Sequence, residues 1–80
     1  MTVTAEISYY PLSDDYVKPV NDFIEQLADD KITVEIGRMS SLITGDYTEL
    51  MKRLTNAMGE LMKNYPSVFN IKLSNACVVL

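Results

Sequence analysis

The 80-residue chain has no histidine, and Cys77 is its only cysteine. A single cysteine cannot form a disulfide within the chain, ligate an iron–sulfur cluster or complete a Cys/His zinc site. The lack of histidine also excludes the Ser-His and Cys-His arrangements of common hydrolases. A carboxylate pair such as Glu6 with Glu35 is the remaining route to acid–base catalysis. We therefore expect no metal site and no catalytic residue, and we expect that the protein is not an enzyme.

Basic residues are also scarce, because seven Lys and Arg against eleven Asp and Glu give a net charge of −4. Nucleic-acid binding relies on clustered Lys and Arg, and only Lys52 and Arg53 are adjacent here. The first twenty residues lack the apolar segment of a signal peptide, and no apolar run approaches the roughly 20 residues that span a bilayer. We expect a cytoplasmic protein that binds neither nucleic acid nor membrane.

The short chain predicts a single domain over residues 1–80 with a thin hydrophobic core. A chain of this length buries only about 60–65% of its unfolded surface, and small domains commonly gain stability from disulfides, metals or self-association. The first two are excluded above. The hydrophobic content of 48% leaves enough apolar surface for the third. We expect a homo-oligomer.

Hydrophobic periodicity predicts six elements along the chain. Alternation with period two indicates strands, and spacings of three and four indicate helices. The second helix has the clearest pattern, with apolar residues from Tyr47 to Tyr65 on one side. In chain order the predicted elements are a strand over 2–10, a helix over about 16–29, strands over 32–36 and 41–45, a helix over 46–65 and a strand over 68–80.

Local signals set the ends of these elements. Pro11 is expected to end the first strand because it cannot donate to a ladder. Residues 13–15 offer N-caps for the first helix, and Asp46 with Glu49 resembles a capping box for the second. Pro66 is expected to terminate that helix.

The order β-α-β-β-α-β predicts an α+β ferredoxin-like sandwich, with a four-stranded antiparallel sheet and two helices on one face. We expect the uncovered face to carry hydroxyl, aromatic and charged side chains. The residues expected under the helices are Ala5, Ile7, Val34, Ile36, Ile71 and Leu73.

Three stretches carry a family resemblance: "ISYYPL", "VEIGRMSSLITGD" and "ELMKRL". In this order and spacing, over about Val3 to Leu73, the chain resembles the thiamine-binding, YkoF-like family of small ferredoxin-like proteins. The resemblance implies a non-catalytic protein that binds thiamine or its hydroxymethylpyrimidine moiety. It also implies a homodimer or homotetramer assembled through the sheet, with no cofactor other than that ligand.

The resemblance also implies where the ligand binds. Asp46 is already explained as a helix cap, and Arg38 lies where the family often has a small residue or proline. A cation at that position disfavours the thiazolium ring of thiamine and favours the neutral pyrimidine. The implied ligand-binding residues are Ser8, Tyr10, Ser40, Ser41, Thr44 and Asp46.

A different interpretation remains open, in which the protein is an oligomerising regulatory module without a small ligand.

Overall fold

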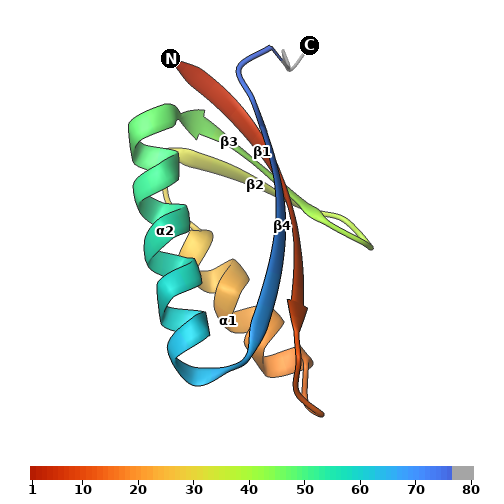
Figure 1. Ribbon diagram of the computed structural model, residues 1–80. Helices are drawn as coiled ribbons and strands as arrows, with labels where there is room; N and C mark the ends of the chain where they lie inside the picture. The colour runs from red at the N-terminus through yellow and green to blue at the C-terminus, as the bar shows by residue number, and fades with distance from the viewer. Residues whose placement is uncertain (77–80) are drawn as a thin grey trace.

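The structure of the protein, a computed structural model, describes residues 1–76. Its elements follow the predicted β-α-β-β-α-β order, and the two helices lie on one face of a four-stranded sheet (Figure 1). The ferredoxin-like α+β fold is therefore confirmed. Neither helix of the described chain is long and apolar enough to cross a membrane. The elements are β1 (Thr2–Pro11), α1 (Val17–Leu27), β2 (Ile32–Ile36), β3 (Ser41–Asp46), α2 (Tyr47–Asn64) and β4 (Ser67–Ser74).

The sheet has the strand order β2-β3-β1-β4, and every neighbouring pair is antiparallel. Directly paired residues point to the same face of a sheet. Ile7 pairs with Ser41 on β3 and with Ile71 on β4, so these three side chains face the helices. The neighbouring residues, such as Ser8 and Leu42, belong to the other face, which we call the open face because neither helix covers it (Figure 1).

The core lies between the two helices and the centre of the sheet. Its middle strands contribute alternate residues, as period-two burial requires, and α2 contributes residues three or four positions apart. Partly buried aromatic and methionine side chains pack around this cluster. The buried apolar residues are Val3, Ala5, Ile7, Phe23, Leu27, Ile32, Ile43, Leu50, Leu54, Ala57 and Leu61.

β1 ends at Pro11 as expected, and Pro11 itself is the last paired residue, opposite Ser67 on β4. Two predicted boundaries were wrong. α1 stops at Leu27 instead of residue 29, because Ala28 has extended backbone angles and Asp29 joins the turn into β2. β4 ends at Ser74 instead of continuing to residue 80, since the Ser74 hydroxyl accepts from the Ala76 N–H in a turn. Residues 77–80 of that predicted strand lie outside the described residues.

The prediction that the helices bury the apolar side of β4 was also wrong. Ile71 and Leu73 point to the helix side but stay exposed. β4 is an edge strand, and α2 packs on β3 and β1. The helix layer is therefore too narrow to cover Ile71 and Leu73, whereas Phe69 on the same side of β4 packs against the core.

Candidate functional site

A tight hairpin turn joins β2 to β3 at residues 37–40. The Gly37 N–H donates to the Ser40 carbonyl oxygen across 2.9 Å. A Cβ atom at residue 37 would lie 2.7 Å from that oxygen, closer than non-bonded atoms approach. Glycine at this position therefore allows the turn to close. The closed turn fixes the backbone positions of Arg38, Met39 and Ser40.

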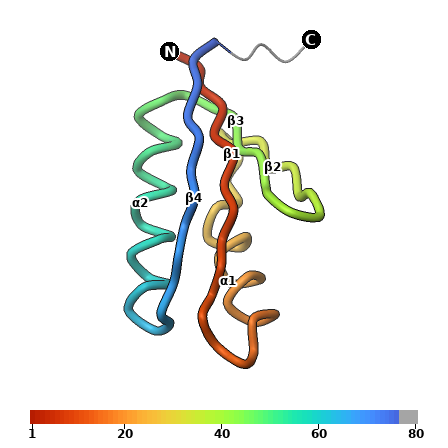
Figure 2. Tube along the Cα trace, turned by 45° about the vertical axis from the view of Figure 1, so that its right-hand side comes forward, coloured from red at the N-terminus to blue at the C-terminus, as the bar shows by residue number. Residues whose placement is uncertain are grey.

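This turn forms one wall of a cleft of about 360 Å³. The opposite wall is the N-terminal half of α1, and the floor is the end of β1. Figure 2 shows the hairpin projecting from the sheet on the side away from α2, and no residue of α2 lines the cleft. Its volume lies within the roughly 300–1,000 Å³ of typical small-molecule sites.

Exposed apolar side chains gather around this cleft. Ile36, which was expected under the helices, is 65% exposed, and Val17 is 58% exposed. Met39, at the tip of the hairpin, is 88% exposed. Val17 lies in the first turn of α1 and Ile36 at the last residue of β2, where the helix and sheet layers separate. Both residues line the cleft, which explains why Ile36 is not buried as expected.

Aromatic rings form the floor. The Tyr9 ring stacks on Phe69 with centroids 4.6 Å apart and planes 6° apart, and it meets Phe23 at 5.2 Å in a tilted contact. The Tyr9 hydroxyl shares a 3.2 Å hydrogen bond with the Ser67 hydroxyl on β4. Such a packed and tethered ring loses little conformational entropy when a ligand binds.

Polar groups stand at the hairpin side of the cleft. Ser41 faces the helices, and its hydroxyl has no hydrogen-bond partner within residues 1–76. The Ser40 hydroxyl donates to a Glu6 carboxylate oxygen on the open face across 3.3 Å. Asn21 on α1 and Arg38 in the turn complete the polar lining. The site can therefore combine a flat apolar surface with hydroxyl, amide and guanidinium groups at its edge.

The structure brings two of the six residues implied by the resemblance to this cleft, Ser40 and Ser41. Ser8, Tyr10 and Thr44 lie on the open face, on the other side of the sheet. Successive residues of a strand point to opposite faces, so Ser8 points away from the cleft although its neighbours Ile7 and Tyr9 line it. The Thr44 hydroxyl shares a 3.2 Å hydrogen bond with the Thr4 hydroxyl.

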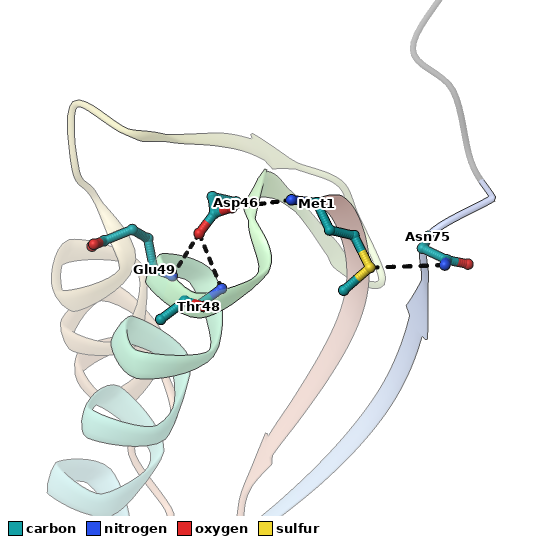
Figure 3. Close-up of polar contacts among 5 residues, drawn as sticks. All are labelled: Met1, Asp46, Thr48, Glu49 and Asn75. Atoms are coloured by element: carbon teal, nitrogen blue, oxygen red, sulfur yellow. Dashed lines mark hydrogen bonds and ion pairs between the residues drawn. The ribbon is translucent and has the colours of Figure 1, made fainter.

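Asp46 lies at the other end of β3, about 17 Å from Ser41 along a strand of this length. Figure 3 shows its carboxylate at the start of α2, where it accepts the Thr48 and Glu49 N–H groups at 3.2 and 3.4 Å. The Glu49 N–H, followed by the Met1 ammonium, holds the pKa of Asp46 below its usual value. Its predicted role as a helix N-cap is confirmed.

The sequence analysis did not select Tyr9, Val17, Asn21 or Met39 as site residues. Their positions could have indicated that they are exposed, since Val17 lies at the start of a predicted helix and Met39 lies in a predicted turn. Apolar residues at such ends extend past the layer that would cover them. Arg38 was noticed only as a departure from the family pattern.

Solved structures share this fold over nearly the whole chain. A protein from Streptococcus pneumoniae superposes with a TM-score of 0.86 at 17% identity, over 98% of this chain and 90% of its own. A Thermotoga maritima protein, named as a candidate thiamine biosynthesis/salvage protein, gives a TM-score of 0.80 at 20% identity, over 91% and 82%. A domain of unknown function from Bacillus cereus gives 0.77 at 20% identity, over 92% and 75%.

At these identities the likeness of the structures shows the fold alone. No curated protein matches the sequence. The family profile described as the YKOF-related family, in contrast, matches residues 2–77, which is almost the entire chain. The chain therefore belongs to the YKOF-related family.

Proposed function

We propose that this protein is a cytoplasmic, non-catalytic, homo-oligomeric binding protein for thiamine or its hydroxymethylpyrimidine moiety. The observation that carries the proposal is the cleft between α1 and the hairpin of β2 and β3. Membership in the YKOF-related family supports a small-molecule binding role. The thiamine-related name of the Thermotoga maritima protein supports this choice of ligand.

The chemistry of the cleft suits an aminopyrimidine. Such a ring is flat and apolar on its faces, and donors and acceptors lie around its edge. The Tyr9 ring provides an aromatic surface, and the free hydroxyl of Ser41 provides both a donor and an acceptor. The Asn21 amide adds the same two capacities from the opposite wall.

The arrangement of the carboxylates favours binding over acid–base catalysis. Glu6 and Glu35 both pair in register with Leu42, so a strand lies between them and their backbones are about 10 Å apart. The Glu6 carboxylate also lies 3.8 Å from the Lys72 ammonium. Both glutamates are on the open face, away from the cleft, where no ring bound at Tyr9 could meet them.

Replacing Ser41 by alanine tests the proposed site. We expect hydroxymethylpyrimidine to bind about 2- to 10-fold more weakly, since a neutral hydrogen bond of ordinary net strength is lost. The melting temperature should stay within about 3 °C of the wild type, because the hydroxyl bonds to no other described residue. Isothermal titration calorimetry and a thermal melt measure the two quantities.

Asp46→Ala is the matched control for this experiment. It removes the cap of α2 and should lower the melting temperature by about 4–8 °C without changing the affinity. If Asp46→Ala loses affinity while its melting temperature is unchanged, the ligand binds near Asp46, at the opposite end of β3 from the proposed cleft. If calorimetry detects no binding of thiamine or hydroxymethylpyrimidine at millimolar concentration, the proposed function is wrong.

The open face supports the homo-oligomeric part of the proposal. Tyr10, Leu42 and Val68 are exposed there, on three of the four strands. We expect light scattering after size-exclusion chromatography to give twice or four times the chain mass of 9.0 kDa. Leu42→Arg should shift the protein toward single chains, while Glu6 and Glu35 on either side accommodate the guanidinium. A wild-type mass of one chain would contradict assembly.

The exposed apolar residues of the open face also suit the second interpretation, in which the protein is a regulatory module that oligomerises without a small ligand. That function predicts the multiple chain mass together with no heat from either ligand. Calorimetry and light scattering on the same sample therefore separate the two functions.

A further inference from the structure

The cleft differs from the rest of the molecule in its charge. The chain carries eleven acidic and seven basic side chains. Of the residues within 1–76 that line the cleft, only Arg38 is charged, and none carries a carboxylate. A bound cation would therefore face a guanidinium with no adjacent acidic group in the lining. A bound anion would meet an opposite charge.

Arg38 is also available to a ligand. Within residues 1–76 it forms no ion pair, whereas Lys18, Arg53, Lys63 and Lys72 each meet a carboxylate. The Glu6 carboxylate accepts from Ser40 beside the turn, but it points to the open face and is already near Lys72. The closed turn holds the Arg38 backbone at the edge of the cleft and leaves its long side chain to reach a ligand.

From these observations we propose that the cleft selects a heteroaromatic ligand that carries a phosphate ester, which Arg38 binds. The inference rests on the proposed function, because the ring occupies the same site. The hydroxymethyl group of the pyrimidine is an alcohol, and its phosphate monoester is the acidic derivative of that group. A guanidinium presents paired N–H donors that match phosphate oxygens, and such charge-assisted bonds are about twice as strong as neutral ones.

Calorimetry with three ligands tests this selection: hydroxymethylpyrimidine, its phosphate ester and thiamine. With the wild-type protein, the phosphate ester should bind about 10- to 100-fold more tightly than the free alcohol. Added salt should reduce this advantage, since the guanidinium lies at the surface. Thiamine, with its cationic thiazolium, should bind most weakly of the three.

Arg38→Gln should remove the advantage of the phosphate ester, so that the ester binds no more tightly than hydroxymethylpyrimidine. Arg38→Lys should retain part of the advantage, because the charge remains but the paired donors are lost. Lys52→Gln is the matched control, since it removes the same charge from an exposed residue of α2 that does not line the cleft. It should change none of the three affinities.

The outcomes separate this inference from the proposed function. If hydroxymethylpyrimidine and its phosphate ester bind equally well, the site stands and the role of Arg38 is overturned. The same holds if Arg38→Gln keeps the advantage of the ester. If none of the three ligands binds, the proposed function itself fails.

Discussion

Replacing Leu54 by alanine is expected to lower the free energy of unfolding by about 2–5 kcal/mol. Leu54 is 1% exposed and lies in the middle of α2, against the core formed with the central strands. The change removes buried methyl groups and leaves a cavity that close-packed neighbours fill only in part. A domain of this length has roughly 4–12 kcal/mol of stability, so the loss is a large fraction of the whole.

Urea denaturation followed by circular dichroism measures this effect. The midpoint should fall while the slope stays the same, since a change in slope would signal a different denatured or native state. Leu12→Ala is the matched control, because Leu12 is exposed after β1 and should change stability by less than about 0.5 kcal/mol. Equal losses in the two variants would contradict the placement of Leu54 in the core.

Replacing Val17 by tryptophan is expected to abolish ligand binding without unfolding the protein. Val17 is exposed in the first turn of α1 and lines the cleft, so an indole at this position would occupy the space proposed for the pyrimidine. Valine and tryptophan have similar helix propensities, and the exposed backbone position tolerates either. No heat should be detected with hydroxymethylpyrimidine or its phosphate ester, while the melting temperature stays within about 3 °C.

Met62→Trp is the control for this variant. Met62 is exposed on α2, which contributes nothing to the cleft, so the same indole there should leave the affinity unchanged. If Val17→Trp binds as tightly as the wild-type protein, the ligand does not occupy the cleft. If both variants lose binding, the indole acts through the fold or the assembly instead of through the site.

Most of the fold could be predicted because burial here follows sequence period. Alternation correctly placed Ala5 and Ile7 beneath the helices, and the Asp46 cap correctly marked the start of α2. The errors fell where periodicity has no information. The sequence of β4 alternates as a covered strand would, but the width of the helix layer, which periodicity does not specify, leaves Ile71 and Leu73 exposed.

The candidate site could be predicted only in part, because a site depends on which face each residue meets. Ser40 and Ser41 line the cleft, whereas Ser8 and Thr44 look equally suitable by residue type but lie across the sheet. Several other cleft residues, Asn21 among them, come from α1, and only the packing of that helix on β1 and α2 places them opposite the hairpin. No local pattern in the sequence encodes that approach.

The hairpin turn separates the residues that hold the fold from those that we propose select a ligand. Its closure needs Gly37 and the Ser40 carbonyl group, whereas the side chains of Arg38 and Met39 are exposed. Mutations at these two positions can therefore accumulate during evolution with little cost in stability. Descendants of one ancestral chain could acquire new ligand preferences by drift in this turn alone, each inheriting an unchanged scaffold.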